Sequence, residues 1–290
     1  MTRIISSLAE VTDQYDAAYV DLWGCVHNGI IAHQDAVEAL RAFRAAGKVV
    51  VLVTNSPRPR ANVEPQLREF QVPEDCWDTI ATSGDSARSA MFQGAVGQKV
   101  WFVGQPHEAA FFEPLNLLDQ PLNVQTVPLE EAEGIVCCGP ENPEADPAEY
   151  RAQFLYAKQK GLKLLCANPD IVVDRGETRE WCAGALAALY TEMGGESLYF
   201  GKPHPPIYDL AARRLMATGL APANPRILAI GDGIRTDILG ALGDDIDSLF
   251  ITGGLAAKET KTTHQPDENA LNAFIENEKI TPTYAIGQLR

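Results

Sequence analysis

The stretch Tyr19-Val20-Asp21-Leu22-Trp23-Gly24-Cys25, YVDLWGC at positions 19–25, sets how the rest of the chain is interpreted. A short apolar run, 18–22, predicts a buried strand, and Asp21 places a carboxylate at its end. Taken alone, one Asp at a strand end is usually a turn or cap residue. The meaning of Asp21 therefore depends on what stands at the ends of the other strands.

Short apolar runs alternate with helical patterns along the whole chain. Asp35 and Glu38 resemble a capping box that opens a helix, which Gly47 ends, and residues 49–53 form a second apolar run. An amphipathic helix is expected around 207–215. This alternation predicts an α/β fold with a parallel sheet. Further strands are expected at 100–103, 134–138, 162–167, 198–200, 227–230 and 249–252.

Size and charge exclude several classes of function. The chain has 290 residues and a net charge of −15, so its surface repels nucleic acid and anionic membranes, and we expect neither as a partner. The N-terminus lacks the apolar core of a signal peptide, and no run is as long as a membrane span. The six cysteines fit no zinc-ligand spacing and are expected to be buried or semi-buried thiols in a reducing cytoplasm.

Polar groups follow four of the expected strands. Ligands of open parallel sheets bind beyond the carboxyl ends of the strands, so these groups are expected to converge. They supply carboxylates, a hydroxyl, an amide and one lysine, a set that suits phosphoryl transfer: a carboxylate attacks phosphorus, Mg²⁺ binds the carboxylates, and the lysine and hydroxyl hold phosphoryl oxygens. The four groups are Asp21, Thr54-Asn55-Ser56, Gly201-Lys202-Pro203, and Gly231-Asp232-Gly233 with Asp237.

The order of these groups resembles the haloacid dehalogenase superfamily, whose members are mostly Mg²⁺-dependent phosphatases with an aspartate nucleophile. Its four motifs match YVDLWG, VLVTNS, GKP and IGDGIRTDI. The resemblance implies Asp21 as nucleophile, Thr54 and Lys202 as catalytic phosphate-holding groups, Asp232 as metal ligand and Asp237 as support of the metal site. Substrate binding is assigned to Thr54, Asn55, Lys202 and Asp170.

The branch that the chain resembles is class IIA, the nitrophenyl-phosphatase-like group. The segments VTNSPRP, ATSG, ANPD, GKPHPPIY and GDGIRTDILGA carry this likeness. It implies a Rossmann-like parallel-sheet core, residues 1–96 and 197–290, with an inserted α/β cap at 97–196. Relatives with such a cap also imply a homodimer formed through the cap.

Trp23 departs from the family pattern, which has a second Asp at this position. In the family, that side chain is the general acid and its backbone carbonyl binds the metal. Trp23 keeps the carbonyl, so the implied Mg²⁺ ligands are Asp21, Trp23 and Asp232, with Asp237 in support. Indole is no useful acid. His27 or Asp170 could replace the acid, or the indole could form an apolar wall for good leaving groups, or it could pack in the domain core.

We expect a Mg²⁺-dependent phosphohydrolase that cleaves a small phosphorylated metabolite through an aspartyl-phosphate. One alternative is a non-catalytic or degenerate domain that binds a phosphorylated ligand or a partner. Another is a different enzyme on the same scaffold: a phosphotransferase, or a hydrolase of C–halogen or C–P bonds. Dehalogenating relatives need no metal carboxylates, so Asp232 and Asp237 argue against that reaction.

Overall fold

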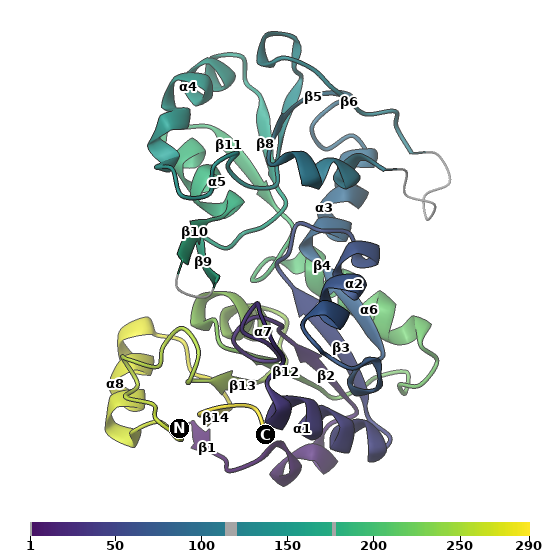
Figure 1. Cartoon of the computed structure of the whole chain (residues 1–290), viewed down its shortest axis with the longest axis vertical. Helices are drawn as coiled ribbons and strands as arrows, with labels where there is room; N and C mark the ends of the chain where they lie inside the picture. The colour runs from purple at the N-terminus through teal and green to yellow at the C-terminus, as the bar shows by residue number, and fades with distance from the viewer. Residues whose placement is uncertain (1, 114–120, 176–177) are drawn as a thin grey trace. The chain divides into compact units, whose positions relative to one another are not determined.

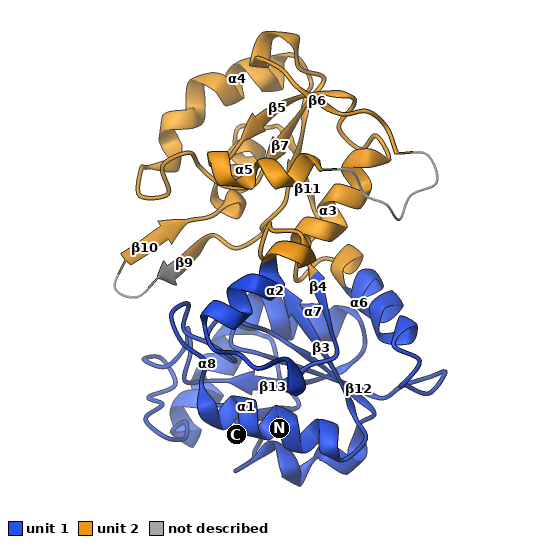
Figure 2. Cartoon of the chain, turned by 45° about the vertical axis from the view of Figure 1, so that its right-hand side comes forward, with its two compact units in different colours: residues 1–54, 63–81, 208–290 blue, residues 55–62, 82–207 orange. Residues whose placement is uncertain are grey.

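The computed structural model describes residues 2–113, 121–175 and 178–290. These residues form two compact units, which Figure 2 colours separately. The first unit holds residues 1–54, 63–81 and 208–290, and the second holds 55–62 and 82–207. The chain passes between the units at four places, the first of them between Thr54 and Asn55.

A seven-stranded sheet organises the first unit (Figure 1). The register shows parallel pairing of β2 with both β3 and β12, and of β13 with β12 and β14. All side chains of β2 and β3 are buried, as expected for parallel strands that are covered on both faces. In sheet order the strands are β1 (Arg3–Ile4), β14 (Tyr284–Ile286), β13 (Asp247–Ile251), β12 (Ile227–Gly231), β2 (Ala17–Val20), β3 (Val49–Thr54) and β4 (Thr79–Thr82).

Amphipathic helices join these strands. α1 buries Val37, Leu40 and Phe43 at helical spacing against the main core cluster of this unit. The expected capping box was wrong: α1 begins at Gln34 after His33, and no side chain caps it. Asp35 lies inside the first turn instead, where its charge favours the helix dipole. The main helices are α1 (Gln34–Ala45), α2 (Arg60–Glu69), α6 (Pro205–Ala217), α7 (Leu239–Gly243) and α8 (Glu268–Glu278).

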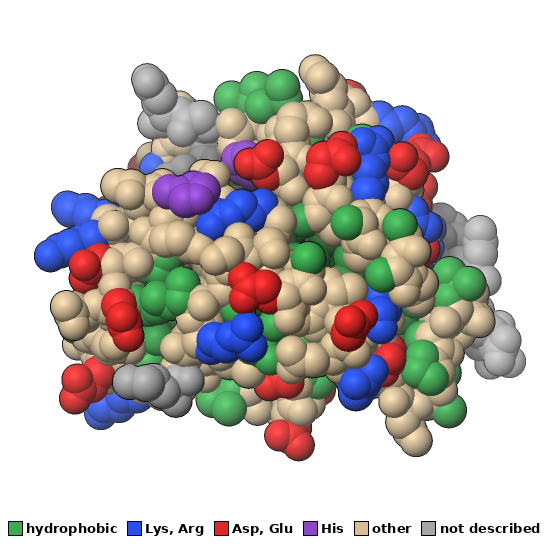
Figure 3. Space-filling view, turned by 90° about the horizontal axis from the view of Figure 1, so that it is seen from below, with side chains coloured by type: hydrophobic (Ala, Val, Ile, Leu, Met, Phe, Trp, Pro, Cys, Tyr) green, Lys and Arg blue, Asp and Glu red, His purple; other side chains and the backbone are tan. Residues whose placement is uncertain are grey.

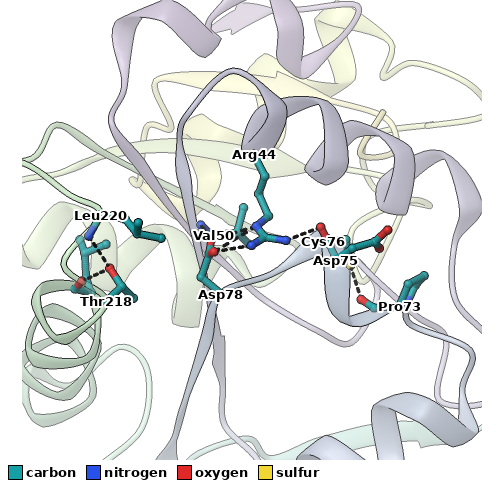
Figure 4. A network of polar contacts seen from close by, with 9 residues as sticks. Arg44, Val50, Pro73, Asp75, Cys76, Asp78, Thr218 and Leu220 are labelled. Atoms are coloured by element: carbon teal, nitrogen blue, oxygen red, sulfur yellow. Dashed lines mark hydrogen bonds and ion pairs between the residues drawn. The ribbon is translucent and has the colours of Figure 1, made fainter.

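A polar network ties the end of α1 to the strands beneath it (Figure 4). Arg44, in the last turn of α1, donates from Nε to the carboxylate of Asp78 at 3.1 Å and from a terminal nitrogen to the carbonyl of Asp75. The same carboxylate accepts the backbone N–H of Val50 in β3 at 2.8 Å. Because Asp78 immediately precedes β4, one carboxylate fixes the helix and two strands together.

A second, five-stranded sheet organises the other unit. All four of its strand pairings are parallel, and α4 (Arg151–Gln159) and α5 (Ala183–Glu192) pack against one of its faces through a shared core cluster. α3 (Ser83–Phe92) belongs to a second cluster with the same sheet. The strands, in sheet order, are β11 (Glu196–Tyr199), β8 (Lys163–Cys166), β7 (Gly134–Cys137), β5 (Lys99–Val103) and β6 (Gln125–Thr126); β9 (Val172–Arg175) and β10 (Thr178–Trp181) form an antiparallel hairpin.

The strand before Lys202 corrects one expectation. We expected the four polar groups to follow strands of one sheet, but β11 pairs with β8, with Leu198 opposite Leu165, and so belongs to the five-stranded sheet. β11 is only partly buried, but its apolar residues give the same sequence signal as a strand of the first sheet, so the sequence does not reveal which sheet it joins. The cap boundaries at 97 and 196 stay a prediction, and the predicted cap includes 114–120 and 176–177, which lie outside the described residues.

The acidic excess of the chain is not gathered on the face shown in Figure 3, where acidic and basic side chains are interspersed. Some charges of the chain pair: Arg226 and Asp16 lie 3.0 Å apart, and this contact lowers the pKa of Asp16 to about 2. Among the described residues, none of the helices has the length and apolar character that a membrane span requires.

Candidate active site

Two carboxylates meet at the ends of neighbouring strands in the first unit. Val20, the last residue of β2, pairs with Ile230 of β12, and the N–H of Asp21 donates to the carbonyl of Ile230 at 2.8 Å. Asp232 follows β12 directly. Within the described residues, Asp21, Asp232 and Cys25 form the one group of potential metal ligands whose donor atoms all lie within 4.8 Å of one another.

The donor set fits a hard divalent cation. Asp232 is only 6% exposed and Asp21 is partly buried, so two ionised carboxylates this close repel each other unless a cation lies between them. Mg²⁺ prefers such oxygen ligands, whereas a thiol suits softer metals. Cys25 is therefore a neighbour of the site rather than a Mg²⁺ ligand. Cys25 was expected to be one of six buried or semi-buried thiols, and all six are buried.

The backbone approaches Asp232 closely and holds its carboxylate. Oδ2 of Asp232 accepts the N–H of Leu255 at 3.1 Å. Gly24 has a φ of +73°, and a Cβ there would lie 2.1 Å from the same oxygen. Only glycine satisfies both the positive φ and the close contact. The glycine of the opening stretch thus brings the loop after β2 against the second carboxylate.

Asp237 does not belong to the group of potential metal ligands formed by Asp21, Asp232 and Cys25. It supports the turn that carries Asp232. It lies in a π-helix, Ile234–Ile238, and is buried. Its Oδ2 accepts the N–H of Gly233 at 3.1 Å. π-helical turns are rare, and they are found frequently at functional sites. The predicted role of supporting the metal site stays a prediction.

The indole of Trp23 packs within its own loop. It is partly buried against the core cluster of the first unit and meets the ring of His27 edge-on, with centroids 5.4 Å apart. A Cβ on Gly29, whose φ is +82°, would lie 2.3 Å from the indole. These contacts agree with the packing role considered for Trp23, and they leave its backbone carbonyl in the loop that follows Asp21.

His27 is not a source of protons near neutral pH. It is 2% exposed, and burial, with a smaller contribution from His33, lowers its pKa to about 4. Its Nδ1 accepts the N–H of Gly29 at 3.0 Å, and its ring lies against Phe70 with centroids 4.9 Å apart. The imidazole is therefore neutral and serves as a packing and turn-forming group, so the acid considered at this position is not supported.

Thr54 ends β3, the strand beside β2, and is buried. The strand order β12-β2-β3 therefore brings the ends that carry Asp232, Asp21 and Thr54 side by side in one sheet. The sheet order agrees with this part of the expected convergence, and the catalytic role of Thr54 stays a prediction.

The second unit gathers the remaining predicted residues around the amide of Asn55. Its Oδ1 accepts the N–H of Lys202 at 2.7 Å, and its Nδ2 donates to the carbonyl of Lys202 at 3.2 Å. Nδ2 also donates to Oδ1 of Asp170 at 2.8 Å. Asn55 and Lys202 are buried, with exposures of 4% and 3%. Three residues that are far apart in the sequence are thus joined by one side-chain amide.

Tyr199 and His204 support the same turn and were missed by sequence analysis. Their rings stack with centroids 4.7 Å apart and an interplanar angle of 12°. The N–H of His204 donates to the carbonyl of Gly201 at 2.9 Å, and burial lowers the pKa of His204. The sequence does show aromatic residues on both sides of Gly-Lys-Pro. It does not show that the rings of Tyr199 and His204 stack, because the stacking depends on the geometry of the turn.

Comparison with known proteins places the chain in a family. The model of the family described as haloacid dehalogenase-like hydrolase matches residues 18–117, and a HAD-hydrolase-like model matches residues 199–275. A crystal structure of a haloacid dehalogenase-like hydrolase from Brucella suis is 36% identical, with a TM-score of 0.85 over 99% of this chain and 100% of that one. The chain belongs to the haloacid dehalogenase-like family of hydrolases.

More distant relatives have named activities. The 5'-nucleotidase YutF of Bacillus subtilis is 24% identical over 86% of this chain and 91% of its own length. A glycerol phosphate phosphatase from Mycobacterium tuberculosis, solved in complex with magnesium, is 24% identical over 84% of this chain and 70% of that one, with a TM-score of 0.64. These findings confirm the predicted family, its class IIA branch, the parallel-sheet α/β fold and the phosphatase class of hydrolase.

Proposed function

We propose that this chain is a Mg²⁺-dependent phosphohydrolase that cleaves a small phosphorylated metabolite through an aspartyl-phosphate on Asp21. The observation that carries this proposal is the pair of carboxylates, Asp21 and Asp232, at the ends of two neighbouring parallel strands. The named relatives act on nucleotides and on glycerol phosphate, which supports a small phosphoester as substrate. Magnesium in the mycobacterial structure supports the choice of metal.

The proposed reaction has two displacements on phosphorus. A carboxylate oxygen of Asp21 attacks the phosphorus atom, the bond to the leaving-group oxygen breaks, and that oxygen departs with the bonding electrons. Water then attacks the phosphorus atom of the aspartyl-phosphate, and the bond to Asp21 breaks to release inorganic phosphate. Mg²⁺, held by Asp21, Asp232 and the carbonyl of Trp23, would neutralise charge on the phosphoryl oxygens.

The other predicted residues have supporting roles in this proposal. Thr54 and Lys202 hold phosphoryl oxygens, and the lysine offsets the repulsion between Asp21 and an anionic substrate. Asp237 holds the turn that carries Asp232. The substrate-binding roles predicted for Asn55 and Asp170 stay predictions. So do the homodimer through the cap and the cytoplasmic compartment.

Trp23 bears on the choice of leaving group. With an indole at this position and a neutral His27 beside it, neither residue supplies a proton to a departing alkoxide. A leaving group that departs as a stable anion needs no acid. We therefore expect aryl or acyl phosphates to be cleaved faster than sugar phosphates.

Phosphate release from a panel of phosphoesters, with and without Mg²⁺, tests the proposal. The panel contains a nucleoside monophosphate, glycerol phosphate, an aryl phosphate and an acyl phosphate. We expect release that requires Mg²⁺ and that is lost in Asp232→Asn unless the Mg²⁺ concentration is raised. Binding of the phosphoesters without release would contradict the proposal and support the non-catalytic alternative. Metal-independent release would contradict the role of the carboxylate pair.

A further inference from the structure

We propose that Asp170 is a positioning residue: its carboxylate fixes which way round the amide of Asn55 lies, and that amide fixes the backbone of Lys202. This inference deepens the proposed function and rests on it, because it concerns the cation that would hold the phosphoryl group. The three residues and their contacts all lie in the second unit.

The amide of Asn55 pairs with both backbone polar groups of one residue. Oδ1 accepts the N–H of Lys202 at 2.7 Å, and Nδ2 donates to its carbonyl at 3.2 Å. The ammonium of a lysine lies at the end of four flexible carbons, so holding the backbone removes one source of variation in its position. The amide therefore restricts the point from which the Lys202 side chain extends.

This pairing requires one of two orientations of the amide. The oxygen and the nitrogen of an asparagine side chain are nearly equal in size, so the group can turn over within the same space. In the reversed orientation, Nδ2 would face the N–H of Lys202, donor against donor, and Oδ1 would face its carbonyl. Packing alone does not select between the two orientations.

Asp170 reinforces the orientation that the backbone of Lys202 favours. Its Oδ1 lies 2.8 Å from Nδ2 of Asn55, and an ionised carboxylate can only accept hydrogen bonds. The nitrogen must therefore face Asp170, which leaves Oδ1 to accept the N–H of Lys202. Hydrogen bonds to an ionised group are stronger than neutral ones, so the contact with Asp170 strengthens the preference for this amide orientation.

The carboxylate is itself held in place by its loop. The N–H of Asp170 donates to Oδ1 of Asn168 at 3.0 Å, and its carbonyl accepts the N–H of Gly184 at 3.1 Å, near the start of α5. On the other side, a Cβ on Gly201 would lie 2.5 Å from Oδ1 of Asn55. The nitrogen of the Asn55 amide thus faces a carboxylate that its loop holds in place, and the oxygen lies close to the backbone of Gly201.

Substitutions at position 170 test the proposal through kcat/KM for a phosphoester and inhibition by inorganic phosphate. Asp170→Ala should lower kcat/KM by about tenfold and weaken inhibition by phosphate, with the Mg²⁺ requirement unchanged. Asp170→Asn should lose less activity than Asp170→Ala, because its amide oxygen can still accept from Asn55. Exposed Glu149→Ala is the matched control in the same unit and should behave as wild type.

Exchanging the two side chains gives the sharpest comparison. Asn55→Asp sets a carboxylate against Asp170, so a loss of about 100-fold is expected. Adding Asp170→Asn should recover at least about tenfold of that loss. In the double variant, the amide at position 170 would donate to the carboxylate at position 55. That carboxylate could still accept the N–H of Lys202. A double variant that is no better than Asn55→Asp alone would overturn the proposal, and so would equal losses in Asp170→Asn and Asp170→Ala.

Hydrogen exchange at the Lys202 amide gives a readout that does not depend on activity. In protein labelled with ¹⁵N-lysine, exchange of this amide should be slow in wild type and in Asp170→Asn, and faster in Asp170→Ala. Unchanged exchange in folded Asp170→Ala would overturn the proposal. If wild type releases no phosphate from any phosphoester, the proposed function fails, and the exchange rates still decide whether Asp170 positions Lys202.

Discussion

The two units hold their charged groups by different means. In the first unit, backbone groups hold the carboxylates: Asp21 donates its N–H to β12, and Asp232 accepts the N–H of Leu255 beside a glycine. In the second unit, one side-chain amide holds Lys202 by both of its backbone polar groups. The carboxylates of the proposed site are thus placed by strand ends, and its lysine by a side chain.

This difference predicts different sensitivities to substitution. The backbone contact of Asp21 survives replacement of its side chain, and the amide oxygen in Asp232→Asn can still accept the N–H of Leu255, so Asp21→Asn and Asp232→Asn should lose catalysis or metal affinity while the local fold remains. The Asn55 amide is itself the support of Lys202, so its loss should move the lysine even where every catalytic group is retained. The following predictions test that contrast, in order of decreasing expected effect.

Removing the nucleophile should have the largest effect. Asp21→Asn keeps the size of the side chain but removes the charge that attacks phosphorus, so kcat should fall by about 10⁴-fold or more. Phosphate release measures this, with mass spectrometry to exclude deamidation back to Asp. The exposed Asp13→Asn in the same unit is the control and should be fully active. Substantial turnover by Asp21→Asn would contradict the assignment of Asp21 as the nucleophile.

Removing the lysine should lower kcat/KM by about 100-fold, and by no less than about tenfold, or ~1.4 kcal/mol. Lys202→Ala deletes the charge proposed to hold a phosphoryl oxygen, while the Asn55 contacts to its backbone remain available. Lys163→Ala, whose ammonium pairs with Glu196 at 2.7 Å on the surface of the same unit, is the control. A loss below about tenfold would mean that another group holds the phosphate.

Acid should weaken the first unit through His27. Burial lowers the pKa of His27 to about 4, against about 6.5 in an unfolded chain, so the unfolded state binds more protons between these values. The contribution of a neutral His27, about 3 kcal/mol, is therefore complete above about pH 6.5 and is lost as pH falls toward 4.

Urea unfolding at pH 5 and pH 7 measures this effect. His27→Asn, which offers a side-chain oxygen to the Gly29 N–H, should show a smaller difference between the two pH values than wild type. Exposed His264→Asn should leave the difference as it is. Equal pH dependence in wild type and His27→Asn would show that His27 has no part in it.

The contact between Trp23 and Gly29 should have the smallest effect. Gly29→Ala places a Cβ 2.3 Å from the indole at a φ of +82°, whereas Gly47→Ala has a similar φ of +77° and meets nothing within 4 Å. Both changes introduce backbone strain, so the difference between them reports the indole contact, and we expect about 1–3 kcal/mol more destabilisation for Gly29→Ala. Equal free energies of unfolding would mean that the indole moves away easily.

The carboxylates of the site were easier to predict from the sequence than the placement of its lysine. The strands that lead to Asp21 and Asp232, and the strand that Thr54 ends, are neighbours in one sheet. Every side chain in β2 and β3 is buried, so these strands appear in the sequence as uninterrupted apolar runs that can be recognised. The run before Lys202 is also apolar, yet it joins the other sheet. Apolar character predicts a buried strand without saying which strand it pairs with.

Other features depend on contacts between distant residues. The bond from Asn55 to Asp170 spans 115 positions, and no local pattern predicts it. The protonation state of His27 depends on burial beside Phe70, which the sequence of its own loop does not show. The false capping box at Asp35 was a local pattern that starts inside the helix, since α1 begins at Gln34.

Trapping the covalent intermediate tests the central claim most directly. Wild-type protein is mixed with an aryl phosphate and Mg²⁺, quenched in acid during the first turnover, and treated with borohydride, which reduces an aspartyl-phosphate to homoserine. We predict homoserine at position 21 in a Mg²⁺-dependent amount, and none in Asp21→Asn. Homoserine at another aspartate, or none at position 21 while phosphate is being released, would contradict Asp21 as the nucleophile.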